Sequence, residues 1–444
     1  MLPSTLGALL ASASLANAHA SRFPHAPHKA RGSNAVSTSV VVSATHAATA
    51  LATPKSFPDK TDLVAATWYA GWHSDDFPLS SVSWDKYTHI TYAFAETAPS
   101  VTELSLNGSN PALLPEFVST AKKNGVKALI SIGGWTGGLY FSTNVGSAEN
   151  RTAFVKTVTD FVTNYSLDGV DFDWEYPNAA GIGCNNLNAN DTANFLSFLQ
   201  ELRAHPVGSN LIVTAAASLN TWYDANQSPS ADLSGFADVL NYIAVMNYDV
   251  WGSWSDTAGP NGPLNDTCAT DPARQVGSGV TAIAAWNKAG IPLNQLVLGV
   301  PAYGHSFRVS LGANETLDAY PAFNKTNKPV GDRWDETELP PDVCGNPQSA
   351  GGTFTYWGLI EGGFIKEDGT VVDGIQSGFD DCSQTPYVYN ATSDVFVSYD
   401  NARSFKAKGE FIDSTGLRGF ATWEAGGDYK DTLLDSIRDA AGFC

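Results

Sequence analysis

From Leu63 onward, short β-rich runs alternate with amphipathic helical stretches, and this alternation limits the possible folds more than any other feature. It is typical of parallel β/α units, in which each helix carries the chain back to begin the next strand. Apolar residues at helical spacing between Phe154 and Tyr165, for example, predict one buried helix face. The eight expected strands cover residues 64–70, 89–95, 127–134, 169–175, 211–218, 242–249, 296–304 and 416–424.

Eight such units favour an α/β fold of the closed TIM (β/α)8 barrel type over an open doubly wound sheet. No Gly-rich G-x-G-x-x-G opens a helix after the first strand, as an open nucleotide-binding sheet would require. The spacing breaks once, because more than a hundred residues separate strands seven and eight, where an ordinary unit needs about thirty. We expect residues 58–305 and 396–444 to form the barrel, and residues 306–395 to form a small α+β domain inserted beside its mouth.

Two segments precede the first expected strand. Residues 1–20 hold an apolar run followed by small residues that obey the A-x-A cleavage rule, which is typical of a secretory signal peptide. Residues 21–57 lack a persistent helical or strand period, and we expect a flexible leader or propeptide. We therefore predict a secreted, extracellular protein. Possible glycosylation acceptors of the Asn-x-Ser/Thr type include Asn107, Asn150, Asn164, Asn190, Asn265, Asn314, Asn324 and Asn390.

The charge balance restricts the partners. The chain carries 25 Lys and Arg against 45 Asp and Glu, and a formal net charge of -20 argues against nucleic acid or an anionic membrane as a partner. No run after the signal peptide is apolar for long enough to span a bilayer. An uncharged or weakly cationic substrate fits this balance better, and we expect the protein to act as a monomer.

Secretion would make the five cysteines candidates for disulfides. Because five is an odd number, one thiol should be left over, and the pairing cannot be deduced from spacing. We favour a bridge between Cys344 and Cys382, since both lie in the expected inserted domain.

The fourth expected strand, GVDFDWE, carries a row of acids. Residues at every second position of a strand share one face, so Asp171, Asp173 and Glu175 should point the same way. The apolar residues between them should pack under the helices, which leaves the acids lining the barrel interior toward the C-terminal rim, where barrel enzymes keep their sites. Asp168 has the opposite parity and is expected to be a structural residue at the helix-to-strand turn.

Such a row costs stability unless the protein uses it. Neighbouring carboxylates would lie roughly 6 to 7 Å apart along the backbone, and at an effective dielectric of about 20 each ionised pair would repel by about 2 to 3 kcal/mol. We therefore expect shared protons, with the outermost Glu175 protonated near neutral pH and able to act as a general acid.

A solvated edge strand or a cation site is the alternative explanation of the acids. An edge strand would not need the apolar opposite face, and a metal would recruit His or further carboxylates at neighbouring strand ends, where His305 is the one histidine found. We therefore expect no metal and no cofactor.

The spacing of Asp168, Asp171, Asp173 and Glu175 resembles the D-x-x-D-x-D-x-E signature of glycoside hydrolase family 18, the chitinases, on that family's fourth strand. The stretches SIGGW at 131–135 and MNYD at 246–249, and Trp423 at the end of the eighth strand, are also similar to that family. The resemblance covers nearly everything from residue 62 to 444. The inserted segment looks like the chitinase insertion domain of the deep-groove subfamily.

The resemblance implies retaining, substrate-assisted hydrolysis of β-1,4-linked N-acetylglucosamine polymers, so the expected partner is chitin or its oligosaccharides. Glu175 would protonate the glycosidic oxygen, and the carbonyl oxygen of the substrate's own N-acetyl group would close an oxazolinium ring. Asp173 would hold the N–H of that ring, and Asp171 would share a proton with Asp173. Tyr248 resembles the phenol that hydrogen-bonds the acetyl carbonyl.

A second set of residues is expected to bind the sugar or support the site. Trp423 would form the apolar floor, because the C–H faces of a pyranose stack on an indole, and Asp249 would lie beside the same sugar. The other expected lining residues are Tyr69, Phe94, Trp135, Tyr176 and Met246, with ordinary barrel packing as the alternative for Tyr69, Phe94 and Trp135. The expected supporting residues are Ser131, as a donor to Asp171, with Gly133, Gly134, Asp168 and His305.

Two other functions stay open on the sequence alone. A protein of this fold without its acid would bind sugar and not cleave it, but the presence of Glu175, Asp173 and Tyr248 favours an enzyme. An enzyme acting on the chitobiose core of N-linked glycans would share the acidic signature, although such relatives generally lack the inserted domain. The sequence does not decide between attack at chain ends and attack at internal bonds.

Overall fold

The structure is a computed structural model that describes residues 63–312 and 315–443. The expected signal peptide at 1–20, the expected leader at 21–57, Asn314 and Cys444 lie outside the described residues.

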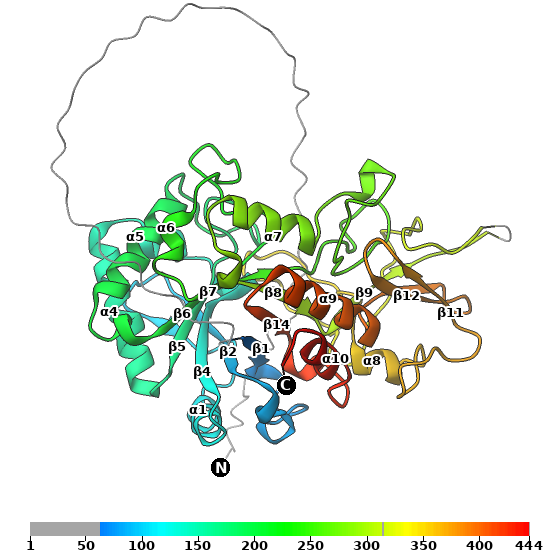
Figure 1. Ribbon diagram of the computed structural model, residues 1–444, viewed down its shortest axis with the longest axis horizontal. Helices are drawn as coiled ribbons and strands as arrows, with labels where there is room; N and C mark the ends of the chain where they lie inside the picture. Colours follow the sequence, from blue (N-terminus) through cyan, green and yellow to red (C-terminus); the bar gives the residue numbers. More distant parts are fainter. Residues whose placement is uncertain (1–62, 313–314, 444) are drawn as a thin grey trace, which may run out of the picture.

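Eight parallel strands close into a barrel, which confirms the expected TIM fold (Figure 1). The hydrogen-bonded order around the ring is β1, β14, β8, β7, β6, β5, β4 and β2, and β2 pairs with β1 to close it. The barrel strands are β1 (Val64–Ala70), β2 (His89–Thr97), β4 (Lys127–Gly133), β5 (Gly169–Asp173), β6 (Ile212–Ala217), β7 (Tyr242–Met246), β8 (Leu296–Pro301) and β14 (Gly419–Trp423). A short β3 (Leu104–Ser105) pairs antiparallel with the end of β2.

The helices surround the ring of strands, and the expected local signals explain their ends. Helix α4 begins after Ser147, whose side chain accepts the N–H of Asn150, and the chain after α1 turns at Gly125, which has a φ of +73°. The longer helices are α1 (Leu114–Lys123), α4 (Ala148–Tyr165), α5 (Asp191–Ala204), α7 (Gly279–Lys288), α9 (Ala402–Thr415) and α10 (Thr432–Ala440). The shorter helices are α2 (Gly134–Gly137), α3 (Phe141–Val145), α6 (Ser234–Ala237) and α8 (Tyr356–Glu361).

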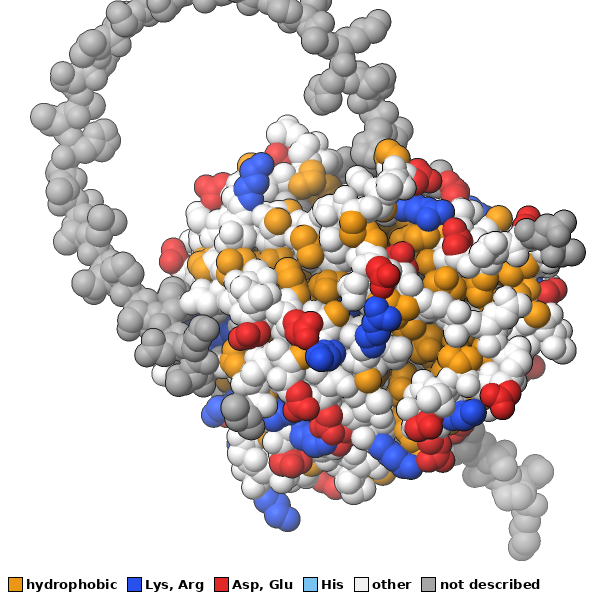
Figure 2. Space-filling view, turned by 45° about the vertical axis from the view of Figure 1, so that its right-hand side comes forward, with side chains coloured by type: hydrophobic (Ala, Val, Ile, Leu, Met, Phe, Trp, Pro, Cys, Tyr) orange, Lys and Arg blue, Asp and Glu red, His pale blue; other side chains and the backbone are white. Residues whose placement is uncertain are grey.

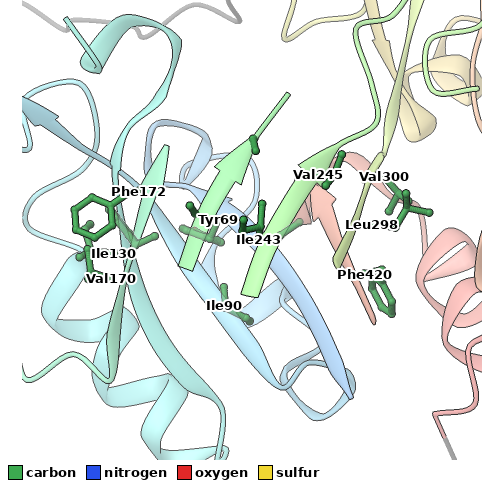
Figure 3. Packing of buried hydrophobic residues seen from close by; sticks show 14 of the residues in the cluster. Tyr69, Ile90, Ile130, Val170, Phe172, Ile243, Val245, Leu298, Val300 and Phe420 are labelled. Atoms are coloured by element: carbon green, nitrogen blue, oxygen red, sulfur yellow. The ribbon is translucent and has the colours of Figure 1, made fainter. Parts of the chain in front are cut away.

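The core lies on both sides of the strands. Outward-facing residues such as Ile130, Val170 and Phe172 group together on one side of their strands and pack under the helices (Figure 3). A smaller apolar cluster that includes Trp68 and Ala421 fills the barrel interior. The expected alternation in β5 is confirmed, because its apolar residues belong to the outer cluster and its acids do not.

Several barrel strands end earlier than predicted. β5 ends at Asp173, β7 at Met246 and β8 at Pro301, whereas we expected them to reach residues 175, 249 and 304. The predicted strands are too long because residues typical of β-strands continue past the last residue that pairs with a neighbouring strand. Glu175 and Asp249 therefore follow the strands in the loops of the C-terminal face, where barrel active sites are built.

An antiparallel five-stranded sheet with α8 lies beside the barrel, which confirms an inserted α+β unit between β8 and β14 (Figure 1). Its strand order is β10, β9, β13, β12 and β11. The strands are β9 (Tyr303–Arg308), β10 (Thr353–Thr355), β11 (Gln376–Asp380), β12 (Thr385–Asn390) and β13 (Val395–Ser398). Because β9 begins two residues after β8 ends, the inserted sheet is fastened directly to the barrel rim.

The expected bridge between Cys344 and Cys382 is wrong. Cys344 pairs with Cys184, at a Cα–Cα distance of 5.6 Å, and Cys382 pairs with Cys268, at 5.7 Å. Each bridge joins the insertion to a barrel loop, and neither lies within the insertion. Membership of one domain was therefore a poor guide to pairing, because both cysteines stand on segments that reach toward the barrel.

Charged residues are spread over the one face of the molecule that Figure 2 shows. On the face in Figure 2, acidic and basic side chains are interspersed with uncharged and apolar ones. Within residues 63–312 and 315–443, no helix combines the length and apolar character that crossing a membrane requires.

Candidate active site

The deepest acid of the row, Asp171, is fully enclosed by hydrogen-bond donors. Only 2% of Asp171 is exposed, and its Oδ2 accepts the Nε1–H of Trp68 at 3.2 Å and the hydroxyl of Ser131 at 2.8 Å. Its Oδ1 accepts the hydroxyl of Thr214 at 2.6 Å. Burial raises the pKa of Asp171, and these three bonds oppose the rise because they favour the ionised carboxylate.

Asp173 stands one step further toward the mouth and is differently placed. It is 4% exposed, and its buried Oδ1 has no hydrogen-bond partner among the described residues. Burial, followed by the charges of Glu175 and Asp171, raises the pKa of Asp173 well above its usual range. A buried carboxyl oxygen without a donor favours a proton or an incoming N–H group.

Glu175 is the outermost acid and follows β5 in the loop. Burial, and then the charge of Asp249, raise the pKa of Glu175 to about 7, while a hydrogen bond with the Tyr176 side chain acts in the opposite direction. Glu175 and Tyr176 are both half-buried, so a ligand can reach them. A carboxyl group with a pKa near 7 can hold a proton at neutral pH and release it to a bound molecule.

The opposite wall of the site is built around Asp249, which follows β7. Its Oδ1 lies 2.7 Å from the hydroxyl of Tyr303 and 2.7 Å from Nε2 of His305, both on β9. The ring of Tyr248 lies 6.2 Å from that of Tyr303. Burial, followed by the charges of Asp173 and Asp249, raises the pKa of Tyr248, so its phenol stays a hydrogen-bond donor.

Aromatic side chains form the floor at the barrel mouth. Trp423, the last residue of β14, stacks on Phe94 with ring centroids 5.6 Å apart, and Phe94 stacks on Trp72 at 5.9 Å. Met246 packs on the same interior cluster, and all four side chains are partly exposed. An apolar, half-exposed ring surface of this kind suits the C–H face of a sugar.

Two glycines keep the row of acids in place. Gly133 has a φ of +109°, and a Cβ there would lie 2.1 Å from the carbonyl oxygen of Asp173. Gly134 has a φ of +79°, and a Cβ there would meet the Phe94 ring at 2.9 Å. Both positions therefore exclude side chains, because β4 passes so close to β5 and to the floor. Asp168 lies below, where its Oδ2 accepts the N–H of Ala128 at 3.0 Å and ties β4 to β5.

The structure corrects one expected lining residue. Tyr69 is 1% exposed and points away from the barrel interior, with its ring 6.0 Å from that of Phe117 and its hydroxyl donating to the Phe77 carbonyl oxygen at 2.7 Å. The interior position at the end of β1 belongs to its neighbour Trp68, which was not among the expected site residues. Trp135, on the short helix α2, is half-buried at the mouth.

Other missed residues carried weak sequence signals. Thr214 is the polar residue in the apolar run IVTAAA of β6, and strand alternation could have marked it as inward-facing. Trp72 lies in the 3-10 turn that follows β1, so no strand period indicates its direction. Tyr303 shares one face of β9 with His305, but the expected seventh strand ran through residue 304 and did not separate β9 from β8. The expected bond from Ser131 to Asp171 is confirmed.

These groups can act together on one ligand. Three acids follow one another toward the mouth. Asp171 is buried and accepts three hydrogen bonds, Asp173 is buried with one oxygen unpaired among the described residues, and Glu175 is half-exposed with a pKa of about 7. A phenol and an apolar floor border them. This arrangement suits proton transfer to a neutral, partly apolar molecule bound at the C-terminal mouth of the barrel.

Known proteins resemble the chain over most of its length. It is 53% identical to a chitinase-like effector of Moniliophthora roreri over 386 residues, which are 86% of this chain and 93% of that protein. It is 31% identical to Chitinase A1 of Niallia circulans over 327 residues, 70% of this chain and 42% of that protein. A solved chitinase from Rhizomucor miehei has a TM-score of 0.77 and 34% identity, covering 85% of this chain and 99% of that one.

The protein-family model described as Glycosyl hydrolases family 18 matches residues 64–428, which is most of the sequence. The matched range contains the eight barrel strands, the inserted sheet and every residue of the site described above. The chain therefore belongs to glycosyl hydrolase family 18 and is a glycoside hydrolase.

Proposed function

We propose that the protein hydrolyses β-1,4-linked N-acetylglucosamine polymers by a retaining, substrate-assisted mechanism with Glu175 as the general acid. Relatives named chitinases support the substrate class. The inserted sheet supports a polymer substrate over the core of N-linked glycans, because its Tyr303 and His305 build one wall of the site.

The observation that carries the mechanism is the contrast between Asp171 and Asp173. Asp171 accepts three hydrogen bonds from barrel side chains, whereas the buried Oδ1 of Asp173 has no partner among the described residues. An ordinary nucleophilic carboxylate would need to reach the sugar carbon itself. A buried oxygen that lacks a donor instead matches the N–H of an acetamido group, which becomes more acidic as a positive charge develops on it.

The proposed reaction has two steps. Glu175 donates its proton to the glycosidic oxygen while the bond from that oxygen to the sugar carbon breaks. The acetamido carbonyl oxygen forms a bond to the same carbon and closes an oxazolinium ring, whose N–H is held by Asp173. The Glu175 carboxylate then takes a proton from water as that water opens the ring, which restores the configuration.

The other groups have matching roles in this proposal. Tyr248 donates its phenolic hydrogen to the acetyl carbonyl oxygen, and Asp171 exchanges a proton with Asp173 as the charge moves. Trp423 and Phe94 support the apolar face of the ring. Asp249, Tyr176, Trp135 and Met246 line the sugar site.

We also propose that the protein acts outside the cell as a monomeric glycoprotein. The N-terminal sequence supports export, and two disulfides agree with an oxidising compartment. The acceptor asparagines named above that lie among the described residues are exposed or half-exposed, at Asn107, Asn150, Asn164, Asn190, Asn265, Asn324 and Asn390.

Sugar binding without turnover is a second candidate, because the relatives at 53% and 52% identity are named chitinase-like effectors. Hydrolysis of a soluble fluorogenic N-acetylglucosamine oligomer distinguishes the two candidates. Wild type should release the fluorophore, and Glu175→Gln should bind the oligomer but lose activity by about 100-fold or more, the usual contribution of a general acid.

Two further readouts test the mechanism. The kcat/KM of the wild type should fall as pH rises through about 7, because Glu175 must be protonated to act. The first product should keep the β configuration. Equal turnover by wild type and Glu175→Gln, or inversion of the product, would contradict the proposal, and binding without turnover by wild type would favour the second candidate.

A further inference from the structure

A long excursion of the inserted domain, residues 336–350 between β9 and β10, is held closed at its base by one carboxylate. Asp335 is 7% exposed, and its Oδ2 accepts the N–H groups of Gly331 at 2.7 Å and Gly352 at 2.9 Å. Its Oδ1 accepts the N–H of Gly351 at 2.6 Å. The two ends of the excursion therefore meet at Asp335. We call residues 336–350 the strap.

The base of the strap is anchored beside the aromatic floor. Trp334 stacks on His73 with ring centroids 3.8 Å apart and donates its Nε1–H to Asp76 at 2.8 Å. His73 Nδ1 lies 2.6 Å from Oε1 of Glu424, the residue that follows Trp423. The base is thus linked through His73 to the buried Glu424, which is next to the floor residue Trp423 in the chain.

The far end of the strap is anchored beside the acid. Cys344 is bonded to Cys184, which lies in the loop between β5 and α5. That loop folds back on the site, because a Cβ at Gly181 would lie 2.0 Å from the carbonyl oxygen of Glu175. The second anchor therefore stands on the segment that carries Glu175.

The two anchors lie on opposite sides of the barrel mouth. Trp334 contacts His73 and Asp76 in the loop after β1 and lies close to Gly426 in the loop after β14. In the ring of eight strands, β1 and β14 are three and four positions from β5, so these loops face the loop after β5 across the mouth. From Trp334 to Cys344 the chain takes ten steps, which can span up to about 33 Å when extended. Most side chains between the anchors are exposed, including Glu336, Glu338 and Val343, so the anchors and not core packing set the strap's position.

We propose that the strap bridges the substrate groove and makes a long polysaccharide enter by a chain end. This inference rests on the proposed function and concerns how the same site selects its substrate. A groove open along its side accepts an internal stretch of polymer directly. A bridge held beside the floor by Trp334 and beside the acid by a disulfide blocks that approach, whereas a short oligomer enters below it.

The test compares two disulfides of the same protein. Cys184→Ser with Cys344→Ser releases the far end of the strap. Cys268→Ser with Cys382→Ser is the matched control, because it also removes a bridge between the insertion and a barrel loop, at a sequence separation of 114 against 160. Asp335→Asn is a second strap variant, which weakens the base without removing a disulfide.

Each variant is assayed on a soluble chitin derivative and on a short fluorogenic oligomer. Internal cleavage is measured as the fall in viscosity per reducing end formed. We expect a several-fold rise in this ratio for the Cys184/Cys344 variant and a smaller rise for Asp335→Asn, with an unchanged ratio for the Cys268/Cys382 variant. Turnover of the short oligomer should stay close to that of wild type, which also reports an intact fold.

The outcomes separate the two proposals. An unchanged ratio in the Cys184/Cys344 variant, or an equal rise in the control, would overturn the strap proposal and leave the proposed function standing. If wild type cleaves neither substrate, the proposed function fails. The strap proposal is then tested by measuring how tightly the polymer and the oligomer bind. Release of the strap should then strengthen binding of the polymer and not of the oligomer, and equal binding would overturn the proposal.

Discussion

The hydrogen bond from Thr214 to Asp171 gives the sharpest test of how the barrel interior holds its acids. Thr214→Val keeps the shape of the side chain and removes the hydroxyl that lies 2.6 Å from Oδ1 of Asp171. Trp68 and Ser131 both donate to Oδ2, so Oδ1 would be left buried without its donor. Ser131→Ala is the matched control, because Oδ2 would keep the bond from Trp68.

The expected loss follows from these partners. A bond to a charged group contributes about 1.5 to 3 kcal/mol, and leaving a buried acceptor unsatisfied costs about 1 to 3 kcal/mol. We therefore expect Thr214→Val to lower the free energy of unfolding by about 2 kcal/mol, and Ser131→Ala by about 1 kcal/mol because one donor to Oδ2 remains.

The pH dependence of this loss has a definite sign. The pKa of Asp171 is raised in the folded state, so its contribution to stability is fully present below the unfolded pKa and falls as pH rises through the folded pKa. The Thr214 bond opposes that rise, so removing it raises the pKa of Asp171 further. The destabilisation by Thr214→Val should therefore grow with pH, being smallest in acid, where Asp171 is protonated.

Urea unfolding of both variants at several pH values measures these quantities, with the m-value checked for constancy. Two results would refute the reasoning. One is a decrease in the free energy of unfolding of Thr214→Val that is no larger than the decrease in Ser131→Ala. The other is a loss that stays constant or shrinks as pH rises.

Two further predictions concern the neighbours of the acids. Asp249→Asn removes a charge that raises the pKa of Glu175, so the basic limb of the kcat/KM profile should move below pH 7, and a limb that stays or moves upward would contradict this. Gly133→Ala should lower the free energy of unfolding by about 2 kcal/mol or more, because its φ of +109° and the Asp173 carbonyl oxygen both exclude a Cβ. Gly125→Ala is the control, because Gly125 has a φ of +73° but open space around it, and this change should lower the free energy of unfolding by about 1 kcal/mol. Equal decreases in the two variants would show that the contact with β5 does not matter.

The alternation of side chains along a strand let the sequence predict much of the site. Asp171 and Asp173 share the interior face with the period of two that the strand imposes, and the apolar residues between them pack outside. Tyr69 was placed wrongly, because it was assigned to the mouth from its position at the end of β1 and not from the alternation of the strand. The interior side chain is its neighbour Trp68, which donates to Asp171.

Apart from the bond from Ser131 to Asp171, the hydrogen-bond partners that come from distant segments were not predicted. Thr214 and Trp68 reach Asp171 from β6 and β1, and Tyr303 and His305 reach Asp249 from the first strand of the insertion. These meetings depend on strand order and register around the closed ring, which local periodicity does not encode.

The sequence by itself determined the kind of structure and the chemistry it carries. Eight β/α units, one long interval and a row of acids with period two specify a barrel, an insertion and an interior carboxylate face, because each is a local pattern. Only the tertiary structure decided which cysteines pair, which donors surround Asp171, and that the strap joins the floor side of the mouth to the acid side. Those features depend on where closure of the barrel brings separate loops together, and closure is a property of the whole ring of strands.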